Sequence, residues 1–297
     1  MSLNKQARMP EKLLPVYQIQ DFDQLVTTKN SDFYLNTFEN HLREHTFIQK
    51  PHKHDFFIIL LITQGTGTHT IDFVTYPVAP QMAFFLSPGQ VHAWQLSDDT
   101  RGHILFFSLD FYRTQQHLQN PRLFPFFHGL FQKPVLQIPL EQLTPLMDIV
   151  TQLKQELTHK EWQWPEVIRE YLMILLVKLS RIYKVQYTNL PVSNSLWEQL
   201  EILIEQNFKK HQPVSFYAEN LNLTEKQLNE ACKNTFNKTT SALIQERVLL
   251  EAQRLLTHSN LTITQIAAEL GYFDNSYFGR FFKKHTGQTP EQFRLNA

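Results

Sequence analysis

The sequence has few of the features that mark secreted, membrane-bound or disulfide-stabilised proteins. Its 297 residues include one cysteine, Cys232, which excludes an intramolecular disulfide and any zinc site built from several thiolates. The longest uninterrupted apolar runs, residues 56–62 and 171–177, have seven residues each, whereas a membrane-spanning helix needs about 18. The N-terminus also lacks the apolar stretch of a secretory signal. We therefore expect a cytoplasmic protein with no membrane partner.

An excess of charge of either sign is missing too. Lys+Arg and Asp+Glu both total 28, so the net charge does not indicate a nucleic-acid partner, and any basic surface must be local. With 42% hydrophobic and 19% charged residues, the composition is that of an ordinary globular protein. Its length predicts roughly two domains.

The two halves of the chain differ in their apolar pattern. From about Asp32 to Ser108, short stretches rich in Phe, Ile, Val and Thr alternate with turn signals at residues 64–67, 76–77, 87–89 and 101–102. This pattern predicts a β-barrel or sandwich. After Pro139, apolar residues recur at helical spacing, and that pattern lapses between residues 185 and 193. The predicted class is α+β multidomain, in the order arm (1–15), barrel (16–139), supporting helices (140–184), linker (185–193) and helical domain (194–297).

The helical domain contains an internal repeat. Residues 214–221 match 263–270 at an offset of 49, and residues 232–239 match 282–289 at an offset of 50. Each copy predicts a short helix, a tight turn at Asn222 or Gly271, and a longer helix, which is the helix-turn-helix pattern. Helix-start signals support this prediction: Thr224 with Gln227, Thr262 with Gln265, Asp274 or Asn275, and Thr289-Pro290.

A continuous amphipathic helix is predicted between the two copies, over residues 241–257. It would be roughly 25 Å long. With a recognition helix on either side, that length suits the ~34 Å between successive major-groove faces of DNA.

The second copy carries a family signature. The string from Leu261 to Arg294, LTITQIAAELGYFDNSYFGRFFKKHTGQTPEQFR, closely resembles that of the AraC/XylS family of bacterial transcription regulators. The resemblance implies a DNA-binding domain from Asn194 to Arg294, with two helix-turn-helix units joined by a long helix. It also implies a ligand-responsive, sequence-specific regulator of transcription. We expect an activator that binds double-stranded DNA, contacts RNA polymerase and forms a homodimer.

The longer helix of each copy supplies the candidate DNA contacts. In the second copy, Phe278, Phe281 and Phe282 predict a buried stripe. The outward residues are then Asn275, Ser276, Tyr277, Arg280, Lys283 and Lys284. Arginine can contact guanine and asparagine adenine in bidentate fashion, whereas hydroxyls and lysines can hold phosphate. The first copy offers Lys226, Gln227 and Asn229, but Glu230 beside them would repel phosphate. For both copies the alternative is an ordinary solvated helix face.

The N-terminal half resembles the cupin-like ligand-sensing domain that is common in this family, between Pro51 and Trp94. His52 and His54 are two residues apart, so on a strand they share a face, and His92 comes from a later strand. In metal-binding cupins a glutamate follows the histidine pair by four or five residues. The positions expected for that glutamate hold Ile58 and Ile59.

Three roles for these histidines stay open: they can bind a metal, orient an acidic ligand, or serve as satisfied polar residues at the barrel mouth. Because barrel mouths are common ligand sites, we expect His52, His54, His92 and Trp94 to line a small-molecule pocket, without metal or cofactor. The surrounding aromatic residues favour an apolar or aromatic effector, which can carry a carboxylate.

Several alternatives remain. The chain can be a cupin metalloenzyme with a helical accessory domain, or a regulator whose barrel binds a protein partner; the missing glutamate argues against the enzyme, and we predict no catalysis. The leucine stripe from Leu143 to Leu157 is either a dimer seam or a face packed on the barrel. Cys232 takes the place of Phe282 in the first copy, as a small core residue or a redox sensor.

Overall fold

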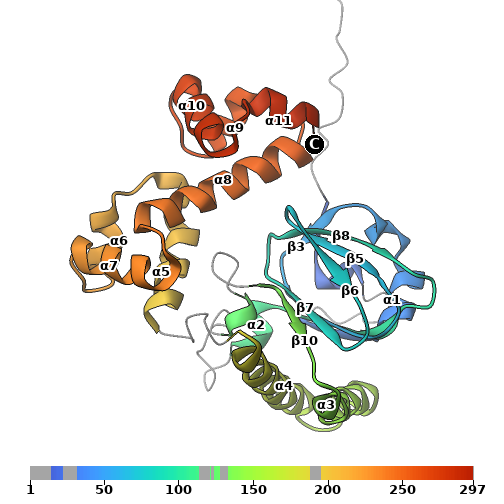
Figure 1. Cartoon of the computed structure of the whole chain (residues 1–297). Helices are drawn as coiled ribbons and strands as arrows, with labels where there is room; N and C mark the ends of the chain where they lie inside the picture. The colour runs from blue at the N-terminus through green and yellow to red at the C-terminus, as the bar shows by residue number, and fades with distance from the viewer. Residues whose placement is uncertain are drawn as a thin grey trace, which may run out of the picture. The chain divides into compact units, whose positions relative to one another are not determined.

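The computed structural model describes residues 15–22, 32–113, 121, 124–127, 133–187 and 195–296. They form two compact units, Val16–Glu201 and the segment from Ile202 onward, which we call the barrel unit and the helical unit (Figure 1). The division falls inside α5 (Ser195–Asn207). Helix α4 (Trp164–Gln186) continues into the segment predicted as a linker, and residues 188–194 lie outside the described residues, as do residues 1–14 of the expected arm.

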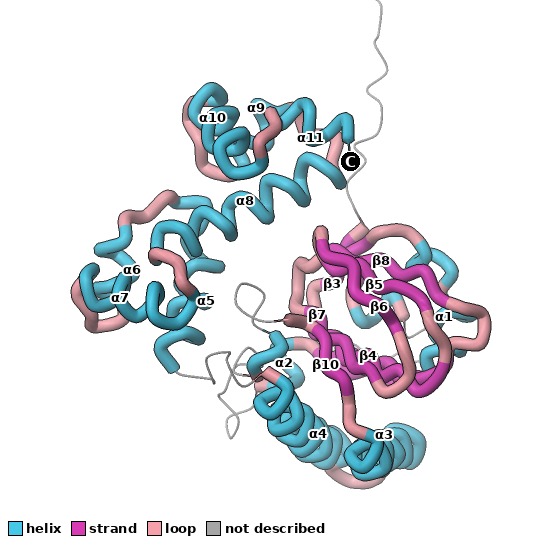
Figure 2. Tube along the Cα trace, in the orientation of Figure 1, coloured by secondary structure: helices cyan, strands magenta, loops and turns pink. Residues whose placement is uncertain are grey.

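The barrel unit is built on two five-stranded sheets (Figure 2). The first has the order β1-β3-β8-β5-β6, with the bounds Val16–Tyr17, His52–His54, Val91–Leu96, Gly67–Ile71 and Val74–Val78. The second has the order β10-β7-β4-β9-β2, with the bounds Val135–Gln137, Met82–Leu86, Phe57–Gln64, Arg101–Phe107 and Phe33–Thr37. The strands predicted between Asp32 and Ser108 are therefore present.

Strand β4 explains why the second sheet is buried on both faces. Successive side chains of a strand point to opposite faces, and β4 is apolar at nearly every position. Ile58 and Leu60 belong to the core between the two sheets. Phe57 and Ile59 belong to a second core on the other face.

Helices complete that second core. The long helices α3 (Leu140–His159) and α4 lie side by side and pack against it (Figure 2). Leu146, Val150 and Leu153 of the leucine stripe are buried there, and its other members are half-buried against the same core. The stripe therefore packs on the barrel within one chain. The shorter helices of the unit are α1 (Phe38–Glu44) and α2 (Leu109–Tyr112).

Two predicted turns are wrong. Pro77 lies inside β6, where it pairs with Thr68 of β5. A proline is tolerated there because β6 is an edge strand, in which a residue can lack an amide hydrogen. The actual turn lies at Asp72, which has a φ of 54°. Gly102 lies inside β9, where a Cβ atom would collide with the carbonyl oxygen of Leu61. Its glycine is required by close strand packing and not by a turn.

The helical unit contains the two predicted helix-turn-helix copies. The first is α6 (Val214–Asn220) and α7 (Glu225–Phe236); the second is α9 (Ile263–Glu269) and α10 (Asn275–Thr286). Helix α8 (Thr240–His258) joins them, as its amphipathic pattern predicted, and α11 (Pro290–Asn296) ends the unit (Figure 1). Cys232 is wholly buried, and burial raises the pKa of its thiol, which favours the core role over the redox one.

A buried ion network holds α5 to α8. The Arg247 guanidinium, 7% exposed, donates to Glu205 at 2.6 Å and to Glu251 at 3.0 Å. It also lies 4.1 Å from the centre of the Phe208 ring. Arg254 donates to Glu251 as well, at 3.3 Å. Removing a partner from such a buried charge is strongly destabilising, because it leaves the charge less compensated.

Among the described residues, no helix combines the length and apolarity needed to cross a bilayer.

Candidate functional sites

The turn of the second helix-turn-helix is fixed by local chemistry. Thr262 and Gln265 form the predicted capping box at the start of α9. Gly271 has a φ of 79°, and a Cβ atom there would collide with the carbonyl oxygen of Lys209, so the position requires glycine. Asp274 then accepts from the Ser276 amide at 2.7 Å and caps α10.

Helix α10 exposes the whole predicted set of DNA contacts. Phe278 and Phe282 are buried, whereas Phe281 is half-buried, with its ring centre 5.7 Å from that of Tyr272. Phe281 therefore borders the buried stripe, contrary to the expectation that it lies inside it. The exposed residues are Asn275, Ser276, Tyr277, Arg280, Lys283 and Lys284. The helix carries one arginine, two lysines and no acidic residue, so this face can receive a polyanion.

Two features beside α10 were missed from the sequence. The side-chain amide of Asn275 donates to the Thr264 hydroxyl at 2.7 Å, which holds Asn275 toward α9. Phe273, in the turn, is fully exposed. A phenylalanine in an apolar pattern is normally read as core, so only the structure identifies Phe273 as a surface residue.

The first copy has the same architecture and a different surface. Asn222 supplies the left-handed turn with a φ of 54°, and Thr224 with Gln227 forms the predicted capping box of α7. Lys226 and Gln227 are exposed as expected. However, the Gln227 side-chain oxygen already accepts from the Thr224 amide and hydroxyl, both at 2.9 Å.

The expectation for Asn229 needs correction. Its side chain is half-buried, and its oxygen accepts from the Thr240 amide at 3.1 Å, which satisfies the first turn of α8. Asn229 thus connects α7 to α8. Glu230 is exposed and lies 4.0 Å from Lys226, whose charge it partly offsets.

The three predicted histidines of the barrel meet between the sheets. His52 on β3 is directly opposite His92 on β8 in the strand register. The Nε2 atoms of His54 and His92 are 2.8 Å apart and share a hydrogen bond. All three rings are buried, at most 4% exposed. The sequence thus identified these three members of the cluster. The expectation that they line a barrel mouth is wrong, because their side chains lie in the core.

Further buried histidines extend the cluster. His69 on β5 shares a hydrogen bond with His92, from Nε2 to Nδ1 at 3.0 Å. His41 shares one with the Tyr34 hydroxyl at 3.0 Å, and its ring centre is 4.9 Å from that of His45. His69 could have been found from the sequence, because it is two residues from the buried Ile71 and therefore points to the same face of β5.

Burial controls the charge of these rings. It lowers the pKa of His52 to about 4 and that of His69 to about 3. It also lowers the pKa of His54 and of His92 well below the ordinary value of 6.5. The rings are therefore neutral near pH 7, and each retains one nitrogen lone pair.

The partners of the cluster are mostly aromatic. Phe56, between β3 and β4, and Phe106 on β9 lie against the His54 ring, with centres 4.6 Å and 6.0 Å away. Trp94 is half-buried beside His92, and its buried indole nitrogen has no hydrogen-bond partner in the described part of the chain. A ligand that reaches these histidines without displacing aromatic rings must be very small.

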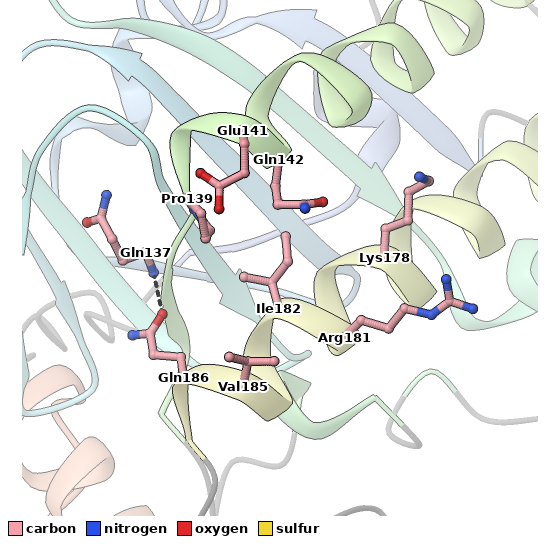
Figure 3. Close-up of a pocket in the computed structure, with 9 residues that line it drawn as sticks. All are labelled: Gln137, Pro139, Glu141, Gln142, Lys178, Arg181, Ile182, Val185 and Gln186. Carbon is pink, nitrogen blue, oxygen red and sulfur yellow. Dashed lines mark hydrogen bonds between the residues drawn. The ribbon is translucent and has the colours of Figure 1, made fainter.

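A pocket of about 650 Å³ lies on the outside of the barrel unit, between β10, the start of α3 and the end of α4 (Figure 3). Lys178 and Arg181 line it from α4, Glu141 from α3, and Ile182 and Val185 give it an apolar wall. Its volume is within the range of organic ligand sites, and its two cations suit an acidic group. Nothing in the sequence pattern indicated it.

Two family models match the chain. A model described as the AraC-like ligand binding domain matches residues 33–176, and a helix-turn-helix domain model matches residues 217–296. The chain is 22% identical over 249 residues to the HTH-type transcriptional activator RhaR of Escherichia coli strain K12, covering 83% of this chain and 87% of RhaR.

Solved structures give similar matches. One is unsaturated fatty acid bound ToxT from Vibrio cholerae strain SCE256, with 15% identity, a TM-score of 0.41, and coverage of 91% of this chain and 97% of ToxT. Another is the C-terminal domain of the response regulator yesN from Fusobacterium nucleatum, with 26% identity, a TM-score of 0.33, and coverage of 34% of this chain and 99% of that domain.

Proposed function

Because the chain belongs to the AraC family of transcription regulators, we propose that it is an activator that binds specific double-stranded DNA sites and responds to a small ligand of its barrel unit. It acts in the cytoplasm as a homodimer, contacts RNA polymerase and catalyses no reaction. The activating role is supported by the name of its relative RhaR, a transcriptional activator.

The observation that carries this proposal is the placement of two polar recognition helices on either side of α8 in the chain. Helix α8 has 19 residues, so at 1.5 Å per residue it is about 28 Å long. This length suits insertion of α7 and α10 into successive major grooves, ~34 Å apart on one side of DNA.

Within α10, Arg280 is the candidate for a bidentate contact to guanine. Asn275 is the candidate for adenine, once its amide leaves the Thr264 hydroxyl. Phosphate contacts are assigned to Ser276, Tyr277, Lys283 and Lys284, with Lys226 and Gln227 from α7. Asn229 has a role in joining α7 to α8 and is left out of the interface.

The test is a selection of sheared host genomic fragments on immobilised full-length protein, at about 0.15 M salt because DNA binding depends strongly on salt. The wild type is run beside Arg280→Ala and beside Arg43→Ala. Arg43 is a matched control, since it is an exposed arginine on α1 in the barrel unit.

Enrichment of a few intergenic fragments by wild type and Arg43→Ala, lost in Arg280→Ala, is the expected result. Equal enrichment by all three proteins would contradict the role of α10 in sequence recognition. Failure of the wild type to enrich any fragment, with or without added ligand, would contradict the regulator itself.

Two places in the barrel unit can receive the ligand: the histidine cluster with His52, His54, His92 and Trp94, and the pocket of Figure 3. A reporter driven by an enriched promoter distinguishes them. Cells are grown with aromatic carboxylates or with divalent metal salts, and His92→Gln is compared with Arg181→Ala. Loss of the response in one variant alone assigns the ligand to that site.

A further inference from the structure

We propose that the histidine cluster binds one divalent transition-metal ion through His52, His54 and His92, and that this ion is the ligand of the barrel. The inference deepens the proposed function and rests on it for the role of the ion as a signal. The binding site itself rests on the geometry of the three rings.

The candidate ligand atoms are already gathered. One nitrogen from each of His52, His54 and His92 lies within 4.8 Å of the other two. In a tetrahedral zinc site with bonds of 2.0–2.1 Å, two imidazole nitrogens are about 3.3 Å apart. The Nε2 atoms of His54 and His92 are 2.8 Å apart. An opening of about half an ångström would therefore admit an ion between them.

His52 has the state that a metal ligand requires. Its Nδ1 atom is 2.7 Å from the Lys50 carbonyl oxygen and can only donate to it, so the lone pair is on Nε2. That Nε2 atom is buried and has no hydrogen-bond partner in the described part of the chain. A histidine whose other nitrogen donates to a backbone carbonyl is oriented as metal-binding histidines usually are.

Size and chemistry select a metal ion over an organic ligand. The three rings are between 0% and 4% exposed and are packed against aromatic side chains, so a metabolite would have to displace part of the core. Three neutral imidazoles without a carboxylate suit zinc, copper, iron or nickel and not magnesium or calcium. The ion also satisfies the lone pair of His52, which is otherwise unpaired in a dry interior.

His69 acts as a positioning residue. When His92 binds the ion through Nε2, its proton is on Nδ1 and is donated to His69 Nε2, 3.0 Å away. This bond fixes the orientation of the His92 ring, and loss of such a bond typically lowers metal affinity by roughly 10- to 100-fold.

The experiment uses untagged full-length protein, stripped with a chelator and then loaded with Zn²⁺ or Co²⁺. The amount of bound metal per chain is measured by elemental mass spectrometry, and the metal affinity is measured by competition with a chelator. The visible spectrum of bound Co²⁺ reports its coordination. The variants are His52→Ala, His54→Ala and His69→Ala. His103→Gln is the control, because His103 lies on β9 of the same barrel opposite Leu61, which faces the other core.

We expect one ion per chain in the wild type and in His103→Gln, with a visible Co²⁺ spectrum that the stripped protein lacks. His52→Ala and His54→Ala should lose the ion. His69→Ala should retain the site with affinity lowered roughly 10- to 100-fold, and His69→Gln, whose amide oxygen can accept from His92, should restore part of it. If alanine at position 52 prevents folding, His52→Gln keeps a polar side chain of similar length and should fold without binding the ion.

Absence of metal in the wild type, or equal metal in all variants, would overturn the site. The same preparations are then used for the fragment selection, so that failure of the metal site can be distinguished from failure of the proposed regulator. Fragments enriched by a protein that binds no ion would refute the ion and leave the regulator intact. An ion bound by the three histidines, with no fragment enriched by loaded or stripped protein, would support the metal site and refute the regulator. An operator affinity that differs about 5- to 150-fold between loaded and stripped protein supports the ion as the signal, and equal affinity refutes that role.

Discussion

Helices α7 and α10 occupy the same place in the two helix-turn-helix copies, and each packs two side chains at an i, i+4 spacing into the core: Leu228 with Cys232, and Phe278 with Phe282. Both follow a left-handed turn residue and end at another. Their exposed residues differ, since α10 has one arginine, two lysines and no acidic residue, whereas α7 has Glu225 and Glu230 beside its two lysines. The repeat therefore preserves the interior, and the outer faces have separate roles.

This difference also extends to how each copy is held. Next to the first copy, the buried Arg247 network ties α5, the helix that precedes this copy in the chain, to α8. In the second, Arg294 of α11 donates to the carbonyl oxygens of Leu256 and Leu261, at 3.2 Å and 2.7 Å. The helix that precedes the first copy is thus held by paired charges, and the helix that follows the second copy is held by hydrogen bonds from a charge to the backbone, so the two scaffolds should respond differently to mutation.

The largest expected effect separates the two scaffolds. Arg247→Ala should lower the free energy of unfolding of the helical unit by about 3–5 kcal/mol, because it removes the buried partner of Glu205 and leaves Glu251 with Arg254 alone. Arg294→Ala removes two hydrogen bonds and should cost about 2 kcal/mol. Denaturant unfolding followed by circular dichroism measures both, with Arg43→Ala as the neutral control. Equal losses of unfolding free energy for Arg247→Ala and Arg294→Ala would contradict the difference between the two scaffolds.

The next effect compares the two recognition helices on DNA. Arg280→Ala should weaken binding to the cognate site by about 1–3 kcal/mol and leave the melting temperature nearly unchanged, since its side chain is exposed and is proposed to contact a base. Lys226→Ala in α7 should cost less than about 1 kcal/mol, because Glu230 already offsets its charge. Fluorescence anisotropy on cognate and random duplexes checks this. If Arg280→Ala loses the same affinity on random DNA as on the cognate site, Arg280 contacts phosphate and not a base.

The phosphate role of α10 can be isolated through salt dependence. Lys284→Ala should reduce the slope of log affinity against log salt by about one, because one fewer counterion is released when the protein binds. The measurement is a salt titration of binding to random duplex DNA. An unchanged slope would show that Lys284 does not reach the backbone.

The opposite change on α7 sharpens the comparison. Glu230→Arg replaces an exposed carboxylate with a guanidinium and should raise affinity for random DNA, with the salt slope steeper by about one. The same titration detects this change. If affinity and slope both stay constant, α7 does not approach DNA closely, and the two copies differ in function as well as in charge.

The smallest effect is the pH dependence of the first scaffold. Burial alone would raise the pKa of Glu251, but the charges of Arg247 and Arg254 outweigh it and hold that pKa below its ordinary value of 4.5. The ionised carboxylate therefore stabilises the fold above pH 4.5, and this stabilisation is lost as the pH falls below 4.5. Denaturant unfolding between pH 6 and pH 3.5 should show a shallower pH dependence for Glu251→Gln than for the wild type. Equal pH dependence of the unfolding free energy in the wild type and Glu251→Gln would contradict the lowered pKa of Glu251.

Much of the helical unit could be predicted because its information is local. The capping boxes at Thr224 and Thr262 and the turn at Gly271 depend on residues a few positions apart, and each is confirmed. The exposed face of α10 also follows from helical periodicity alone. The exceptions involve contacts between elements: Asn229 is half-buried because its side-chain oxygen accepts from the amide of Thr240, 11 residues further along the chain in α8.

The barrel was predicted less completely. Pro77 and Gly102 were misread as turns, because their tolerance inside strands depends on an edge position and on a close neighbour, neither of which is a local property. The histidines at positions 52, 54 and 92 were found from spacing, but their burial and the contribution of His69 depend on pairing between β3, β8 and β5.

By itself, the sequence determined the order of barrel and helical domain and the double helix-turn-helix, because periodicity, capping and turn chemistry act over a few residues. The family was indicated by a resemblance to a known signature. Only the tertiary structure decided that the leucine stripe packs on the barrel, that a pocket opens between α3 and α4, and that the histidines meet in a dry core. Those outcomes depend on side chains that are far apart in the chain and that come together only when the sheets and helices pack.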